Sequence, residues 1–297
     1  MRILLTGSHG QLGTELRSTL DGQGELVAVG RSDCDLADSA ALHRLLERAR
    51  PDVIVNAAAY TAVDRAETEV DRSFAVNAGA PGLIGEWAAA KGVLVVHYSS
   101  DYVFDGRKAS PYLEDDPTDP LGVYGRSKLE GEHRLRHSGA RHLVLRTSWV
   151  AGAHGGNFAR KILRLAGEQA TLRVVADQIG APTTTGLIAQ VTRTLIARAR
   201  AEPDRPLGLY HLAAAGETSW YEYARLVVRT AHEAGFALRA TPDAIVPIRA
   251  AEYPLPARRP ANSRLDTRRL REHFGIELPD WQAGIRHLVA ELAESNR

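Results

Sequence analysis

The chain has 297 residues, of which 44% are apolar and 25% carry a charge. These proportions are typical of a globular protein and exclude a disordered, collagen-like or membrane-spanning chain. Its 37 basic and 36 acidic residues nearly balance, so no strong overall field attracts nucleic acid or an anionic membrane. The single cysteine, Cys34, excludes an intrachain disulfide and a cysteine-based metal cluster. The sequence shows neither the apolar core of a signal peptide nor an apolar run long enough to span a bilayer, and we expect a cytoplasmic protein.

Short apolar strands alternate with amphipathic helices through the first half of the chain. Leucines at positions 12, 16 and 20 place the apolar side chains of the first helix on one face. We expect strands at residues 3–5, 25–29, 53–55, 93–97 and 143–145, and helices at residues 11–20, 39–49 and 80–90. Apolar strands separated by helices indicate repeated βαβ units. They predict an α/β fold with a doubly wound parallel sheet that is covered on both faces.

A glycine-rich turn joins the first strand to the first helix. Gly7, Gly10 and Gly13 form a G-x-x-G-x-x-G pattern. Glycines permit a tight turn and a close approach to a diphosphate, and the helix N-terminus supplies free N–H groups. A purely structural turn is the alternative, but a position between a strand and a helix is what dinucleotide binding requires. We therefore predict a Rossmann-type sheet with a cofactor site at this turn.

Tyr124 and Lys128 stand four residues apart, so on a helix they share a face. The nine tyrosines and four lysines would produce this spacing by chance only about 0.1 times. A nearby ammonium group should lower the pKa of the Tyr124 hydroxyl from its usual value of about 10. The hydroxyl would then act as a general acid or base near neutral pH. An exposed pair on a helix, without function, is the alternative.

A serine hydroxyl is expected beside this pair. The strand at residues 93–97 leads into Ser99, Ser100 and Asp101, and ligands of open α/β sheets bind beyond the carboxyl ends of the strands. Serines in such places often only cap a turn. Next to Tyr124 and Lys128, however, the Ser100 hydroxyl is suited to hydrogen-bond a developing alkoxide. We predict Ser100, Tyr124 and Lys128 as the catalytic residues.

Segments spread over nearly the whole chain resemble the dTDP-4-dehydrorhamnose reductases, a family in the extended branch of the short-chain dehydrogenase/reductase superfamily. The glycine turn and the residues around Tyr124 are shared by the whole superfamily. The Pro-Ala-Arg-Arg-Pro-x-Asn-Ser stretch is particular to the family. In order and without a large gap, the segments are residues 1–13, 51–64, 99–104, 123–125, 146–150, 177–183, 209–212, 220–224 and 256–263.

The resemblance implies a role for each matching residue. Tyr124 would protonate the C4 oxygen of a nucleotide-linked 4-keto sugar as hydride arrives from a nicotinamide cofactor, and Lys128 would bind the nicotinamide ribose. The family commonly has threonine where this chain has Ser100, and serine keeps the hydroxyl. The implied substrate contacts are Ser100, Asp101 and Trp149. The implied cofactor contacts are Gly7, Gly10, Gln11, Leu12, Gly13, Asp35, Leu36, Ala59, Tyr60, Thr61, Tyr124 and Lys128.

We expect two structural units from the length and from this resemblance. Residues 1–150 would form the dinucleotide-binding Rossmann domain, and residues 151–297 mainly a smaller substrate-binding lobe. The boundary is approximate because later segments, such as residues 207–215, are expected to return to the large sheet.

Cofactor preference is predicted from the residues after the second strand. NAD-dependent enzymes place an acidic side chain there, which binds the ribose 2′-hydroxyl. This chain has Gly30 and then Arg31, and a guanidinium group binds a 2′-phosphate well. We predict that NADPH is preferred and that NADH is also used to some extent. The alternative is that Arg31 is a solvated surface residue.

Arg258 and Arg259 lie in a proline-rich loop, at residues 253–260, that should be ordered. Tandem arginines usually form a solvated face, but here they stand close to Asn262. Because arginine binds phosphate oxygens in a bidentate manner, we predict that Arg258, Arg259 and Asn262 contact the nucleotide-sugar substrate.

The sequence contains only part of the metal site that the resemblance implies. Some reductases of the family are described as binding Mg²⁺ through glutamates at a dimer interface. Glu15 and Glu291 are the counterparts here, but Gly186 stands where a further glutamate is expected. The histidines form no H-E-x-x-H zinc motif. We therefore predict no metal ligand residues, and the chain would be a monomer or a homodimer.

Two alternatives to a reductase stay open. A related epimerase or dehydratase shares the fold and the Tyr–Lys pair but keeps its cofactor during the reaction and leaves it unchanged at the end. A dehydratase would carry an acidic pair beside the central hydroxyl residue, whereas Ser100 is followed by Asp101 and then Tyr102. A non-catalytic regulatory subunit is the other alternative, and the intact Ser100, Tyr124 and Lys128 argue against it.

Overall fold

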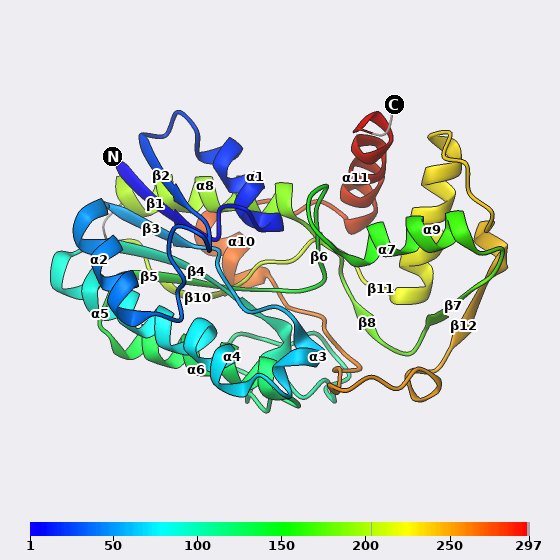
Figure 1. Ribbon diagram of the computed structural model, residues 1–297, viewed down its shortest axis with the longest axis horizontal. Coiled ribbons are helices and arrows are strands. Elements are labelled where there is room, and N and C mark those ends of the chain that lie inside the picture. Colours follow the sequence, from blue (N-terminus) through cyan, green and yellow to red (C-terminus); the bar gives the residue numbers. More distant parts are fainter. Residues whose placement is uncertain (203, 296–297) are drawn as a thin grey trace.

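A six-stranded parallel sheet forms the centre of the larger part of the molecule (Figure 1). The computed structural model describes residues 1–202 and 204–295. The strands stand in the order β10-β5-β4-β3-β1-β2. Their bounds are β1 (Arg2–Thr6), β2 (Glu25–Val29), β3 (Val53–Asn56), β4 (Leu94–Ser100), β5 (His142–Thr147) and β10 (Gly208–His211). The predicted α/β fold with a doubly wound parallel sheet is confirmed.

Helices cover both faces of this sheet because successive side chains of a strand point to opposite faces. Ile3 and Leu5 belong to one apolar core and Leu4 to the other, and all three are fully buried. The first face is covered by α1 (Gln11–Leu20), α8 (Thr185–Ala201) and α10 (Arg268–Phe274). The second face is covered by α2 (Ser39–Ala49), α5 (Ala80–Lys91) and α6 (Val123–His137).

A smaller lobe with its own apolar core lies to the right in Figure 1. Its helices are α7 (Phe158–Glu168), α9 (Trp220–Glu233) and α11 (Trp281–Ser295). Three pairs of short strands complete it. They are β7 (Leu172–Val175) with β12 (Ile245–Ile248), β6 (Val150–Ala151) with β9 (Thr183–Thr184), and β8 (Ile179–Gly180) with β11 (Thr218–Ser219).

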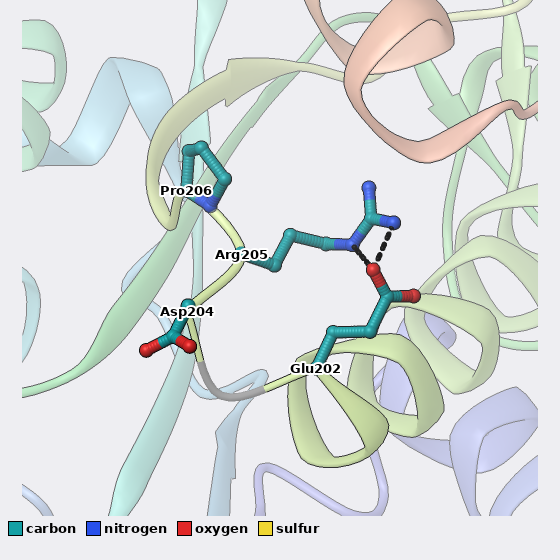
Figure 2. A pocket seen from close by; sticks show the side chains of 4 residues that line it. All are labelled: Glu202, Asp204, Arg205 and Pro206. Carbon is teal, nitrogen blue, oxygen red and sulfur yellow. Dashed lines mark hydrogen bonds and ion pairs between the residues drawn. The ribbon is translucent and has the colours of Figure 1, made fainter.

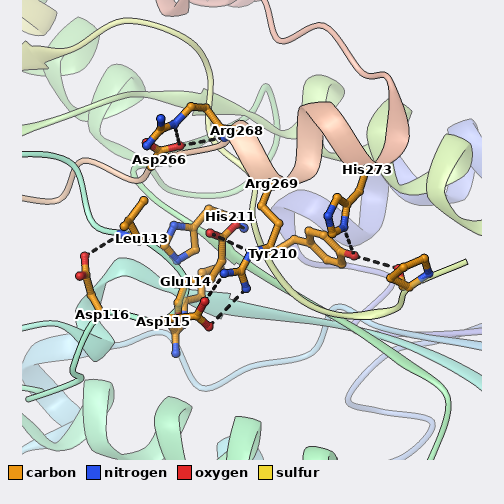
Figure 3. A network of polar contacts seen from close by, with 12 residues as sticks. Leu113, Glu114, Asp115, Asp116, Tyr210, His211, Asp266, Arg268, Arg269 and His273 are labelled. Atoms are coloured by element: carbon orange, nitrogen blue, oxygen red, sulfur yellow. Dashed lines mark hydrogen bonds and ion pairs between the residues drawn. The ribbon is translucent and has the colours of Figure 1, made fainter.

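The chain returns to the large sheet after first entering this lobe. Strand β10 pairs in parallel with β5 at the edge of the sheet, and a polar network fixes it there (Figure 3). The His211 N–H donates to Glu114 Oε1 at 3.0 Å, and the Glu114 carboxylate faces Arg269 of α10. The Tyr210 hydroxyl lies 3.0 Å from His273 Nδ1. Helix α10 therefore anchors β10.

The helix expected at residues 80–90 extends further upstream than the sequence pattern indicated. Helix α4 (Val70–Phe74) continues through a π-helical turn at Ala75–Gly79, labelled η1, directly into α5. The remaining short helices are α3 (Val63–Ala66) and the 3-10 turns η2 (Asp101–Val103), η3 (Pro242–Ala244) and η4 (Ala250–Glu252). Within residues 1–202 and 204–295, no helix has the length and apolar character needed to cross a membrane.

The strand order reverses beside β1, which has β2 on one side and β3 on the other. In open α/β sheets, ligands bind at such a point, outside the carboxyl ends of the strands. The glycine turn follows β1 at this edge, and Ser100 is the last residue of β4. The topology therefore brings the predicted cofactor and catalytic segments to the same edge of the sheet.

Candidate functional site

Gly7 and Gly13, in the turn between β1 and α1, have no space for a side chain. Gly7 has φ +69°, and a Cβ there would lie 2.6 Å from the Ala58 nitrogen. A Cβ at Gly13 would lie 2.0 Å from the Gly7 carbonyl oxygen. Gly10 caps α1 without a side-chain hydrogen bond, so the first N–H groups of the helix are available to an anion. This cradle fits the diphosphate of a dinucleotide.

Gln11 links the glycine turn to the smaller lobe. Its Nε2 donates to the Gly156 carbonyl at 2.9 Å, and its Oε1 accepts from Asn157 Nδ2, also at 2.9 Å. Its side-chain amide therefore joins the glycine turn to the smaller lobe, and only the backbone of Gln11 is left for the predicted cofactor contact. The neighbouring Leu12 packs against the core under α1.

The residues after β2 present a guanidinium group to solvent. The Arg31 side chain is 80% exposed and lies 4.0 Å from Asp35 Oδ2. Asp35 is paired more closely with Arg72, at 2.6 Å, and its pKa is lowered by hydrogen bonds from Ala37 and Arg72 although partial burial acts against them. Leu36 is buried in the core under α2.

The segment Ala59, Tyr60 and Thr61 follows β3 at the same edge of the sheet. The side-chain amide of Asn77, in the π-helical turn, accepts from the Tyr60 N–H at 2.8 Å and donates to the Tyr60 carbonyl at 3.0 Å. It also donates to Ser127 Oγ of α6 at 3.0 Å. Asn77 thus ties the predicted nicotinamide-side loop to the helix that carries the catalytic pair, a role that the sequence reasoning missed.

The three predicted catalytic residues come together. The Tyr124 side chain is hydrogen-bonded to Ser100, and Lys128 one turn further along α6 donates from Nζ to the Tyr98 carbonyl at 2.6 Å. This arrangement requires α6 to pack tightly at its start, where a Cβ on Gly125 would lie 2.2 Å from the Tyr102 carbonyl oxygen.

The pKa of Tyr124 differs from the prediction. Burial raises it to about 12, the nearby Asp101 carboxylate acts in the same direction, and the hydrogen bond with Ser100 acts against them. The predicted lowering by Lys128 is therefore wrong, because desolvation of the buried phenolate is the dominant cause of the shift. Burial lowers the pKa of Lys128 to about 8, against the attraction of Glu132. The Tyr124 phenol consequently keeps its proton at neutral pH.

A buried ion pair lies directly behind Lys128. Glu132 and Arg146 expose 0% and 2% of their side chains. Arg146 donates from Nη2 to Glu132 Oε2 at 2.7 Å and from Nε to Oε1 at 2.9 Å. Ser99 also donates to Glu132. Tyr124, Lys128 and Glu132 follow one another at intervals of four residues and therefore share one face of α6. The sequence analysis did not single out Glu132, although this spacing could have indicated it.

Two predicted substrate residues follow β4 and β5 at this edge of the sheet. Asp101 is buried, accepts from Ser100 Oγ at 3.0 Å, and has a pKa raised by burial to about 6. Trp149 has φ +47°, a conformation that side chains rarely adopt. Its ring stacks on Trp220 of α9, with centroids 3.5 Å apart. The smaller lobe therefore holds this strained tryptophan in one orientation.

The proline-rich loop places its two arginines differently. Arg259 forms a bidentate pair with Asp64, with both N–O distances 2.8 Å, which lowers the pKa of Asp64. Arg258 is exposed. Asn262 is buried, and its Nδ2 donates to the carbonyls of Lys108 and Ser110 at 2.7 and 2.9 Å. Both amide hydrogens of Asn262 therefore hold a neighbouring loop.

One of the carboxylates considered for Mg²⁺ faces the start of α8. Glu15 lies beside Gly186, where a Cβ would be 3.8 Å from Glu15 Oε1, so the two helices meet without a second carboxylate at that point. No group of three or more His, Cys, Asp or Glu side chains that could hold a metal ion exists in the described part of the chain.

A surface hollow lies away from these residues, at the end of α8 (Figure 2). It is lined by Glu202, Asp204, Arg205 and Pro206. Arg205 donates to Glu202 and to the His273 carbonyl, so its guanidinium group is already used to fix the loop that leads into β10.

Comparisons with known proteins find similarity over nearly the whole chain. The family model described as "RmlD substrate binding domain" matches residues 1–294. The dTDP-4-dehydrorhamnose reductases of Burkholderia thailandensis and Escherichia coli K12 are each 46% identical to this chain. The first alignment covers 98% of this chain and 99% of the relative, and the second covers 98% of each.

Solved structures show the same similarity. A dTDP-4-dehydrorhamnose reductase from Clostridium acetobutylicum has a TM-score of 0.91 and 31% identity, and the match covers 98% of this chain and 99% of that chain. The reductase from Bacillus anthracis, solved in complex with NADP, has a TM-score of 0.89 and 29% identity over the same shares. The resemblance seen in the sequence is confirmed, and the chain belongs to the RmlD substrate binding domain family.

Proposed function

We propose that this chain is a dTDP-4-dehydrorhamnose reductase, which converts the C4 ketone of dTDP-4-dehydro-L-rhamnose to the hydroxyl of dTDP-L-rhamnose with NADPH as reductant. The observation that carries the proposal is the convergence of Ser100, Tyr124 and Lys128 at the sheet edge that also holds the glycine turn. The reductases at 46% identity and the related NADP complex support the same reaction and cofactor.

The proton chemistry follows from the site. Bound NADPH would supply the hydride for C4, and Tyr124 donates its phenolic proton to the C4 oxygen. A pKa of about 12 keeps that proton in place until negative charge develops on the substrate oxygen. Ser100 orients the phenol and can share the developing charge. Lys128, fixed by the Tyr98 carbonyl, lies one helical turn from Tyr124 on the same face of α6, and its ammonium group would bind the nicotinamide ribose.

Cofactor binding is assigned to the cradle and to the loops on either side of it. The glycine turn and the start of α1 would hold the diphosphate. The loop containing Tyr60, held by Asn77, would border the nicotinamide half. The exposed Arg31 would pair with the 2′-phosphate and so favour NADPH over NADH.

The smaller lobe would bind the nucleotide-sugar, with Asp101 and Trp149 at its boundary with the catalytic group. Arg259 is the better placed of the two arginines because Asp64 orients its guanidinium group and its charge acts on Tyr102, whose ring contacts Tyr124.

Replacement of Arg259 should weaken substrate binding. We expect Arg259→Ala to raise KM for the nucleotide-sugar about tenfold with little change in kcat, because a charge-assisted contact to a substrate phosphate is lost. Arg259→Lys should recover only part of the loss, since an ammonium group cannot keep the bidentate pair with Asp64 and also reach the phosphate. Steady-state kinetics at saturating NADPH measures KM and kcat for each variant. Arg258→Ala is measured in the same way for comparison. Unchanged KM values in all three variants would remove the loop from the site.

The pH dependence of the reaction should follow the protonation state of Lys128. Its pKa of about 8 means that it is charged below that pH and loses its charge above it. Because the phenol of Tyr124 titrates far higher, we expect kcat/KM for NADPH to be level near pH 7 and to fall above about pH 8. A profile that stays level up to about pH 10 would contradict this assignment.

An epimerase with a retained cofactor is separated from a reductase by stoichiometry. A reductase consumes one NADPH for each sugar converted, whereas an epimerase converts substrate without net consumption. Absorbance of the reduced nicotinamide, followed with product quantification in the same sample, distinguishes them. A folded protein that binds NADPH but consumes none would favour the epimerase or a regulatory subunit.

A further inference from the structure

The position that selects between NADH and NADPH is filled by a side chain from the glycine turn. Gly30 follows β2, about 20 residues after the turn, where NAD-dependent enzymes carry an acidic residue. A Cβ at Gly30 would lie 2.3 Å from His9 Nδ1 and 2.7 Å from His9 Cε1. The imidazole ring of His9 therefore occupies the space that a side chain at position 30 would need.

Backbone contacts hold the two segments together at this point. The Ser8 N–H donates to the Val29 carbonyl at 3.1 Å, which docks the glycine turn on the end of β2. The Gly30 N–H donates to Asp33 Oδ2 at 2.7 Å. His9 itself is exposed, so its ring covers Gly30 while one face stays open to solvent.

The carboxylates that follow β2 already have partners. Asp33 directs its carboxylate to the backbone of the turn, and Asp35 is paired with Arg72 at 2.6 Å. The Arg31 side chain is 80% exposed. An imidazole and a guanidinium group are therefore presented at the end of β2, where the carboxylates are already engaged.

We propose that His9 is a second specificity-determining residue for NADPH. Its imidazole donates a hydrogen bond to the 2′-phosphate, opposite the bidentate contact from Arg31, and it excludes a carboxylate that would bind the 2′-hydroxyl of NADH. The inference rests on the proposed function, because it presumes a nicotinamide dinucleotide at the glycine turn.

Binding measurements test this without relying on turnover. Calorimetric titration would give Kd values for NADPH, NADH and the fragments 2′,5′-ADP and ADP. His9→Ala should weaken NADPH and 2′,5′-ADP about five- to tenfold and leave NADH and ADP unchanged, because only the 2′-phosphate contact is lost. His43→Ala, an exposed histidine on α2, is the matched control and should change none of the four values.

Gly30→Ala provides a second test through packing. The added methyl group must displace the His9 ring, so this variant should show the NADPH loss of His9→Ala although it removes no polar group. In the His9→Ala background the methyl group meets no ring, and Gly30→Ala should then add nothing further. Such non-additivity indicates that both changes act through the same contact.

The outcomes separate the inference from the function on which it rests. Equal affinity of the wild-type chain for NADPH and NADH would overturn the cofactor part of the proposed function. A wild-type preference for NADPH that His9→Ala leaves intact would overturn only the role of His9. An equal loss of NADPH and NADH in His9→Ala would also overturn it, because His9 would then act by shaping the glycine turn.

Discussion

Tyr124→Phe should lower kcat by a factor of about 10² to 10⁴, the usual contribution of a positioned general acid. Phenylalanine keeps the ring that packs edge-on against Tyr102, with centroids 5.4 Å apart, and removes only the hydroxyl that is hydrogen-bonded to Ser100. The Kd for NADPH should stay close to the wild-type value. Single-turnover kinetics with saturating cofactor and nucleotide-sugar would measure the effect on the chemical step.

Tyr210→Phe is a suitable control for this variant. It makes the same chemical change at a hydroxyl that contacts the Pro206 carbonyl and His273, outside the candidate site. Its kcat should remain within about twofold of wild type. A Tyr124→Phe protein that is folded, binds NADPH and retains more than a tenth of the wild-type kcat would assign the proton transfer to another group.

Glu132→Ala should lower the free energy of unfolding by about 3–5 kcal/mol, because it leaves the buried Arg146 charge without its partner. The loss includes two hydrogen bonds from Arg146, at 2.7 and 2.9 Å, and one from Ser99. Because the Glu132 carboxylate also supports the charge of Lys128, the fall of kcat/KM should move to lower pH in this variant. Urea-induced unfolding measures the first effect and a pH profile measures the second.

Glu130→Ala on the same helix is the comparison. Glu130 pairs with Arg134 at 2.7 Å, but the two side chains are 37% and 52% exposed, and such surface pairs contribute about 0.3–0.5 kcal/mol. Similar decreases in the free energy of unfolding in the two variants would show that the buried Glu132–Arg146 pair stabilises the fold no more than a surface pair does.

The sequence pattern predicted the regular parts of the fold well. The first helix was expected at residues 11–20 and α1 is Gln11–Leu20, because its apolar spacing and the flanking glycines are local signals. The π-helical turn at Ala75–Gly79 was missed because it adds a residue to the helical repeat and has no apolar periodicity of its own. Asn77 clamps the Tyr60 loop from this turn, so the missed irregularity lies at the site.

Within the site, the spacing of residues in the sequence predicted the catalytic residues but not the side chains that surround them. The partnership of Glu132 with Arg146 joins α6 to β5, and the stacking of Trp149 on Trp220 joins two segments about 70 residues apart. Such contacts depend on how elements pack. The pKa of Tyr124 was misjudged for the same reason, since the spacing to Lys128 is visible in the sequence and the extent of burial is not.

Deuterium transfer would test the central claim most directly. The purified protein would be given dTDP-4-dehydro-L-rhamnose and NADPH deuterated at the transferable C4 position of its nicotinamide, and the product would be examined by mass spectrometry and NMR. We predict dTDP-L-rhamnose with one deuterium per molecule, bound to C4 of the sugar, and almost no product from Tyr124→Phe. Product without deuterium, or no conversion by a folded protein that binds NADPH, would contradict the account.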